Sequence, residues 1–275
     1  MVLACSFCGI HESEVVQIAN VTYQDGRETH FCLGCFVSGT VDNGAILLSG
    51  PAKVGKTSFC KAFARTALES GRPVVYLPSN ETAGEVRGEI RKALTRSYGE
   101  APALPSEAEG DELRIIDCYS ALMGKQADTK YVLTNLANLT DLSITLKAAW
   151  DGLTKSCLVV DDLTSIVQEA GTDVSLKCLR QLLAKIKGTE TLGLFSLSTD
   201  ILEPRFQNAL VVMFDGILEM KIEDGAEGLE RYIRIYSLRG QKHSTKWNRF
   251  DITNEGIAML PVIQPLQAGT GTRSS

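Results

Sequence analysis

The stretch from Gly50 to Thr57, which reads Gly-Pro-Ala-Lys-Val-Gly-Lys-Thr, constrains the fold of this chain more than any other feature. It matches the pattern GxxxxGK[ST], follows the apolar run AILLS and opens a helical pattern. In such a loop the backbone N–H groups face phosphate, the lysine reaches the β- and γ-phosphates, and the hydroxyl ligates magnesium. We therefore expect a strand–loop–helix unit that binds ATP with Mg²⁺ through Gly50, Pro51, Ala52, Lys53, Val54, Gly55, Lys56, Thr57 and Ser58.

A second part of this expected site is the run Leu158-Val159-Val160-Asp161-Asp162. Its apolar residues indicate a buried parallel strand that ends in acids. Because the carboxyl ends of parallel strands meet at one edge of a sheet, Asp161 is expected beside the phosphate-binding loop. There it would help to hold Mg²⁺ together with Thr57.

Apolar runs alternate with helical patterns through most of the chain, which is typical of a mostly parallel α/β sheet. Beyond about residue 210 the helical patterns cease, and four strand-like runs predict an antiparallel extension. The expected strands are Ala45–Ser49, Val74–Leu77, Arg114–Asp117, Cys157–Asp161, Leu192–Leu197, Ala209–Phe214, Ile217–Ile222, Leu229–Leu238 and Arg249–Ile252. The expected helices are Thr57–Glu69, Ala83–Ser97, Asp141–Trp150 and one with the apolar stripe Leu176, Leu179, Leu183 and Ile186.

Several motifs resemble the RecA superfamily, and within it the KaiC/GvpD branch of ATPases. They are the phosphate-binding loop followed by SFCKAFA, the strand VVYL followed by NET, the strand LVVDDL and the ending YSLRGQKHSTKWNRFDITNEGI. The resemblance covers about residues 40–260. It implies a RecA-like P-loop fold, ATP as ligand and a homo-oligomer, often hexameric, with nucleotide at the subunit interfaces.

Two positions depart from that family's pattern. KaiC-like proteins usually carry paired glutamates after the second strand, which activate the attacking water, whereas this chain has Asn80 and Glu81. They also tend to carry a lysine two residues before the arginine of the RG dipeptide, and here that position is Ser237, while Arg239 and His243 match. The resemblance therefore implies catalytic roles for Glu81, Asn80 and Arg239, in a site that is complete for binding and depleted for hydrolysis.

The N-terminal segment contains two CxxC pairs, Cys5/Cys8 and Cys32/Cys35, separated by 23 residues. Four thiolates at this spacing can surround one Zn²⁺ tetrahedrally, and a module of about 40 residues needs such a metal to fold. A redox pair is the main rival, but no thioredoxin-like pattern accompanies it. His11 and His30 are expected outside the ligand set.

The N-terminal segment resembles the zinc domain of the ClpX unfoldase in three stretches, CSFCG, then HESEVVQIA and later FCLGC. This resemblance implies a protein-docking module. Charge favours the same partner, because residues 1–44 carry five acids and only one base, Arg27, and would repel a phosphate backbone. Residues 231–249 instead carry six bases and no acid, which indicates either solvated surface or a contact with phosphate or an acidic neighbour.

Composition and boundaries complete these expectations. With 44% apolar and 22% charged residues, no run of about 20 apolar residues and no signal peptide, the chain is expected in the cytoplasm. We expect a zinc finger at 1–40, an ATPase domain at 41–263 and a disordered tail at 264–275. The favoured function is a nucleotide-dependent switch or assembly factor with weak ATPase activity. An active ring-forming ATPase or autokinase and a DNA-binding recombinase-like paralogue are the alternatives, although the pI of about 5.4 makes nucleic acid an improbable partner.

Overall fold

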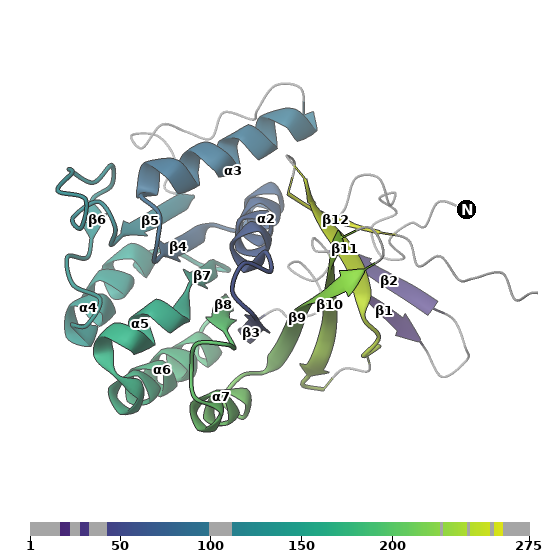
Figure 1. Ribbon diagram of the computed structural model, residues 1–275. Coiled ribbons are helices and arrows are strands. Elements are labelled where there is room, and N and C mark those ends of the chain that lie inside the picture. The colour runs from purple at the N-terminus through teal and green to yellow at the C-terminus, as the bar shows by residue number, and fades with distance from the viewer. Residues whose placement is uncertain are drawn as a thin grey trace, which may run out of the picture.

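The computed structural model describes residues 17–22, 28–32, 43–98, 112–225, 228–240, 243–253 and 256–260. Its centre is a ten-stranded sheet with the order β12-β11-β10-β9-β3-β8-β7-β4-β5-β6 (Figure 1). The strands are β3 (Gly44–Gly50), β4 (Val74–Pro78), β5 (Leu113–Asp117), β6 (Tyr131–Val132), β7 (Cys157–Asp161), β8 (Leu192–Ser198), β9 (Gly216–Gly225), β10 (Gly228–Leu238), β11 (Asn248–Thr253) and β12 (Gly256–Met259).

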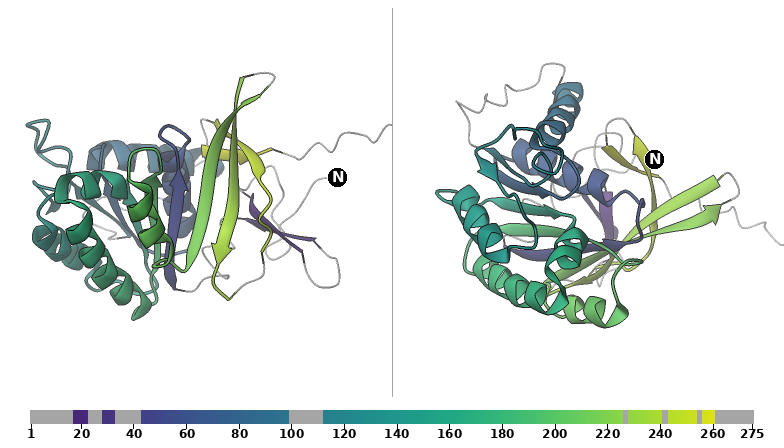
Figure 2. Two further views of the ribbon diagram at one scale, coloured as in Figure 1. Left: turned by 60° about the horizontal axis from the view of Figure 1, so that its bottom comes forward. Right: turned by 60° about the vertical axis from the view of Figure 1, so that its left-hand side comes forward.

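Helices cover both faces of the parallel half of this sheet, which runs from β9 to β6. Figures 1 and 2 show α2 (Lys56–Glu69) and α3 (Ala83–Tyr98) on one face. The other face carries α4 (Leu139–Trp150), α5 (Leu163–Ala170), α6 (Thr172–Lys187) and α7 (Pro204–Val211). Along β3, Ile46 and Leu48 pack into the α2 side, whereas Ala45 and Leu47 pack into the other. This two-sided burial explains why the strands are continuous apolar runs.

Helix starts follow from local capping chemistry. The Thr82 hydroxyl accepts from the Glu85 N–H at 3.3 Å, while the Glu85 carboxylate accepts from the Thr82 N–H at 2.8 Å, a reciprocal capping box at the start of α3. Asn138 caps α4 by accepting from the Asp141 N–H at 3.2 Å. The Asp162 carboxylate caps α5 through the Thr164 N–H at 2.7 Å.

The antiparallel C-terminal extension is confirmed, and it packs against the loop after β3. Strands β9 to β12 form successive antiparallel pairs. Phe250 of β11 is completely buried, and a Cβ built on Gly55 would lie 2.7 Å from the Ile252 side chain. The Phe-x-Ile pattern near the chain's end therefore packs onto the second glycine of the loop, whose φ of 113° disfavours any side chain there.

One predicted strand is wrong, and some elements were missed. Ala209–Phe214 is not a strand, because it contains the end of helix α7 and the turn after it. Phe206 and Leu210, four residues apart, are the buried positions of that helix, and Pro204 occupies its first turn, where a missing N–H costs nothing. A short apolar run cannot distinguish helix from strand without these flanking residues. Helix α5 and the short strands β6 and β12 were also not predicted.

The N-terminal region contains a two-stranded antiparallel hairpin, β1 (Gln17–Thr22) with β2 (Glu28–Cys32). The rest of the predicted zinc finger, and the predicted tail at 264–275, lie outside the described residues. Within the described ranges, no helix is both long and apolar enough to cross a membrane.

Candidate nucleotide-binding site

The phosphate-binding loop joins β3 to α2 as the sequence predicts. Two of its residues have left-handed backbone conformations, Lys53 with a φ of 65° and Gly55 with a φ of 113°. Gly50 fits closely against β9, since a Cβ there would lie 2.8 Å from the Met220 carbonyl oxygen. These constraints fix the curl that turns backbone N–H groups toward an anion at the start of α2.

Lys56 opens α2, but it does not stand at an exposed rim. Its side chain is buried, and its Nζ donates to the carbonyl oxygens of Gly50 at 3.1 Å and Pro51 at 2.7 Å. Burial lowers the pKa of Lys56, while the nearby carboxylates of Asp162, Asp200 and Asp161 act in the opposite direction. The lysine is thus held inside the loop by its own carbonyls, where an entering phosphate would compete for the ammonium protons.

Thr57 and Asp161, the two predicted magnesium ligands, lie side by side. The Thr57 hydroxyl donates to Asp161 Oδ1 at 3.3 Å, although the residues are far apart in sequence. Asp161 is buried at the end of β7, where Ser196 Oγ donates to Oδ1 and Tyr76 OH donates to Oδ2, both at 2.9 Å. A hydroxyl and a carboxylate so placed match the hard oxygen ligands of Mg²⁺.

The electrostatics of Asp161 also fit a cation. Burial raises the pKa of Asp161, and the neighbouring Asp162 carboxylate acts in the same direction, while the hydrogen bonds from Ser196, Tyr76 and Thr57 lower it. A buried acid beside a second acid is stabilised in its charged form when a divalent ion binds. The residues present therefore fit magnesium.

Sequence reasoning missed Asp200, which follows β8. Its carboxylate accepts from the Ala52 N–H at 3.0 and 3.2 Å, and the Thr199 N–H donates to the Gly50 carbonyl oxygen at 3.0 Å. Strand β8 is the direct parallel neighbour of β3, so its carboxyl end meets the loop. Asp200 could have been predicted by examining the acidic residues that follow every strand of the parallel sheet, and not only those after β7.

Comparisons with known proteins agree with this geometry. The sequence pattern of an ATPase family described as KaiC matches residues 32–263. This chain belongs to the KaiC family of ATPases. Among its relatives, the UPF0273 protein PH0284 of Pyrococcus horikoshii is 26% identical over 225 residues, which cover 81% of this chain and 88% of the relative. The UPF0273 protein of Thermotoga maritima is 26% identical over 235 residues, which cover 85% and 92%.

A solved structure shares the fold. The crystal structure of the KaiC-like protein PH0186 from Pyrococcus horikoshii aligns with a TM-score of 0.57 and 21% identity, covering 90% of this chain and all of that one. A KaiC-family, RecA-like domain with a mostly parallel sheet and antiparallel C-terminal strands is thereby established.

Glu81 and Asn80, where KaiC-like proteins carry paired glutamates, follow β4 next to the Asp161 strand. The preceding residue is fixed there, because the Ser79 N–H donates to the Asp161 carbonyl oxygen at 2.6 Å. Asn80 is exposed, and it does not cap α3, since Thr82 performs that role. Glu81 forms an ion pair with Lys61 Nζ at 2.7 Å, and the same ammonium also binds Glu89 at 2.6 Å. The carboxylate of Glu81, the residue expected to activate the attacking water, is thus already paired with Lys61.

Arg239 lies near the start of β3, whereas the phosphate-binding loop of the same chain follows the end of β3. Its Nη1 lies 2.8 Å from Asp215 Oδ1, and the other oxygen of Asp215 accepts from the Ala45 N–H at 3.1 Å. The five residue steps from Ala45 to Gly50 span about 17 Å at ~3.3 Å each. Arg239 therefore cannot serve the nucleotide site of its own chain, and its side chain is 62% exposed.

The zinc prediction remains a prediction. Cys5, Cys8 and Cys35 lie outside the described residues, and Cys32 is the last residue of β2. Within the part of the chain that is described, no group of three or more His, Cys, Asp or Glu side chains could hold a metal ion.

Proposed function

We propose that this chain binds Mg²⁺–ATP and acts as a nucleotide-dependent switch or assembly factor with slow ATP turnover. The contact of the Thr57 hydroxyl with the buried Asp161 carboxylate, directly beside the loop that holds Lys56, carries the binding part of this proposal. Backbone N–H groups at the start of α2 would bind the phosphates, Lys56 would supply a positive charge, and Asp161 would orient the ion. Bound Mg²⁺ would neutralise the phosphate charge that develops during transfer.

Slow turnover is inferred from Asn80 and Glu81. An asparagine amide orients a water molecule but cannot accept its proton, whereas a glutamate can. Glu81 could, but its carboxylate already pairs with Lys61 Nζ at 2.7 Å, so it would have to leave this ion pair to take up a water molecule. Burial alone would lower the pKa of Lys61, but its hydrogen bonds to Glu81 and Glu89 outweigh burial and raise it. The cation that restrains Glu81 therefore stays charged.

We propose that the partner of the N-terminal segment is a protein. Nucleic acid is not the proposed partner, and the ion pairs of the basic stretch 231–249 support this exclusion. Arg234 pairs with Glu219 at 2.6 Å, Arg249 pairs with Glu230 at 2.9 Å, and Arg239 pairs with Asp215. The Lys221 ammonium and the Arg234 guanidinium lie 4.6 Å and 4.4 Å from the centre of the Trp247 ring. Cations neutralised by acids of the same chain release few counterions on binding a phosphate backbone.

Calorimetric titration of Mg²⁺–ATP into the full chain tests the proposed binding. Lys56→Ala should weaken affinity strongly, because charge-assisted contacts to phosphate contribute about 1.5–3 kcal/mol each. Lys92→Ala, at an exposed position of α3, is the matched control and should bind as wild type does. Equal affinities for wild type and Lys56→Ala, with both proteins folded by circular dichroism, would contradict the assignment of this loop.

A further inference from the structure

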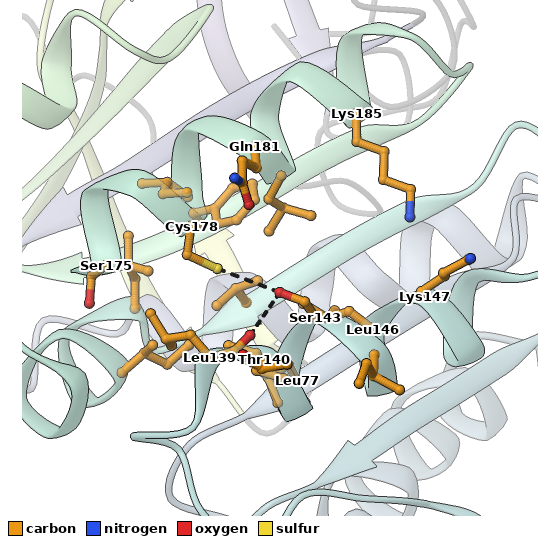
Figure 3. Close-up of a pocket in the computed structure, with 18 of the residues that line it drawn as sticks. Leu77, Leu139, Thr140, Ser143, Leu146, Lys147, Ser175, Cys178, Gln181 and Lys185 are labelled. Carbon is orange, nitrogen blue, oxygen red and sulfur yellow. Dashed lines mark hydrogen bonds between the residues drawn. The ribbon is translucent and has the colours of Figure 1, made fainter. Parts of the chain in front are cut away.

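A cleft of about 380 Å³ lies on the face of the sheet opposite α2 and α3. Helices α4 and α6 form its walls, and the strand residues Val160 and Phe195 line it. A third strand residue of the lining, Leu77, is labelled in Figure 3. Cavities of about 300–1,000 Å³ with apolar walls and a few polar groups are the usual binding sites of small molecules. Nothing in the proposed chemistry of the nucleotide site uses this cleft.

One end of the cleft contains a buried hydroxyl. Ser175, near the start of α6, lines the cleft and is only 4% exposed. Its Oγ has no hydrogen-bonding partner among the described residues. A buried polar group without a partner destabilises the protein, and a polar group of a ligand in the cleft would supply that partner.

The other end carries positive charge. Lys147, in the last turn of α4, and Lys185, in the last turn of α6, both line the cleft and are exposed. Lys185 also stacks over the Trp150 ring at 5.7 Å, which holds its ammonium at this end. Neither lysine forms an ion pair with a carboxylate in the described part of the chain. Figure 3 shows both lysines on the side away from Ser175.

The spacing of these groups defines the shape of the ligand. Ser175 and Lys185 are ten residues apart on one helix, which corresponds to about 15 Å along its axis. Between them the polar side chains Thr140, Ser143 and Gln181 stand at the exposed rim, while the interior is aliphatic and aromatic. A long apolar body with an acid at one end would match both the walls and the charge.

We propose that this cleft binds an elongated apolar carboxylate, whose acid group pairs with Lys147 and Lys185 and whose far end carries a polar group that contacts Ser175. The occupant belongs to the class of medium-chain hydroxy acids. The site does not depend on ATP, because it lies on the other face of the sheet.

Calorimetry of the full chain with decanoate, 10-hydroxydecanoate and decanol, all below micelle-forming concentrations, tests this proposal. Decanoate should bind at least tenfold more tightly than decanol. Lys147→Gln combined with Lys185→Gln should remove that preference, while Lys177→Gln on the same helix, outside the cleft lining, should leave it unchanged. The preference should persist in Lys56→Ala, so that failure here and failure of the proposed ATP site remain distinguishable.

Ser175→Ala tests the far end. Without the unpartnered hydroxyl the ligand-free variant should melt no lower than wild type, so a folding defect is not expected. In wild type, 10-hydroxydecanoate should bind several-fold more tightly than decanoate, and the alanine variant should bind the two equally. Equal binding of decanol and decanoate in wild type, no binding of any of the three probes, or a hydroxyl preference that survives Ser175→Ala would overturn the proposal.

Discussion

Tyr76→Phe should weaken Mg²⁺–ATP binding, although Tyr76 was not predicted as a site residue and is fully buried beneath the site. The phenol OH donates to Asp161 Oδ2 at 2.9 Å, so the substitution removes one hydrogen bond to the carboxylate that orients the metal. Hydrogen bonds to charged groups contribute about 1.5–3 kcal/mol. Because the same bond is present without Mg²⁺, only part of this energy is lost on binding, and at about 1.4 kcal/mol per factor of ten the expected loss of affinity is about 10-fold.

The same substitution should change the pH dependence of binding. Burial raises the pKa of Asp161, and the hydrogen bond from Tyr76 partly offsets that rise, so the variant should have a still higher pKa. Because the ionised carboxylate is the form that holds Mg²⁺, affinity increases as pH rises through this pKa. The increase should therefore occur at higher pH in Tyr76→Phe than in wild type.

Calorimetry of Mg²⁺–ATP binding across the range from about pH 5 to 8 checks both effects. Tyr236→Phe, an exposed tyrosine of the C-terminal strands, is the control and should match wild type. Binding of ATP in excess EDTA should be similar in all three proteins, because the lost bond acts through the metal. An unchanged affinity and pH profile in Tyr76→Phe would refute the role given to Asp161.

Four further predictions follow from the site and its surroundings. Asp161→Asn should raise the melting temperature in EDTA at neutral pH and abolish stabilisation by Mg²⁺–ATP. Because the pKa of Asp161 is raised, the folded state binds more protons than the unfolded state. The stability of the wild type should therefore fall as pH rises from the usual aspartate range toward the pKa of Asp161 in the folded state. Thermal melts across pH should show this fall only in wild type. Asn80→Glu should raise steady-state phosphate release, by up to about 100-fold, because it restores a proton acceptor; no gain, with Glu81→Gln abolishing activity, would show that Glu81 is the whole base. Arg239→Ala should leave folding intact, because Asp215 keeps Lys187 at 3.2 Å, but should reduce ATP-dependent oligomer size by light scattering; an unchanged size would exclude action on a neighbour. Elemental analysis should find one zinc per chain, lost in the Cys5→Ser/Cys8→Ser variant, and zinc retained in that variant would exclude these ligands.

The sequence predicted those parts of the site that depend on strand order. Asp161 was found because a buried parallel strand must deliver its last residue to the edge where the loop lies. Asp200 obeys the same rule at the end of β8, but the pattern around it carries no strand-terminal acid pair and therefore gives a weaker signal. The contact of Tyr76 with Asp161 could not be predicted, because it depends on the pairing of β4 with β7. The periodicity of apolar residues does not show which strands pair.

The failures have equally local causes. The apolar run Ala209–Phe214 has no strict alternation, and the helix it joins is fixed by Pro204 and Phe206, which precede it. The basic stretch has no acids of its own within 231–249, yet three of its six bases, Arg234, Arg249 and Arg239, pair with acids outside it, Glu219, Glu230 and Asp215. Charge counted along a chain does not show charge balance across a sheet.

The fate of bound nucleotide tests the central claim most directly. Wild-type protein is loaded with Mg²⁺ and radiolabelled ATP, separated from free nucleotide, and the bound fraction is quenched and resolved into ATP and ADP over time. A slow switch predicts about one nucleotide per chain that stays mostly ATP for minutes, with no label retained by Lys56→Ala. Complete conversion to ADP within a second, or label retained equally by Lys56→Ala, would contradict the account.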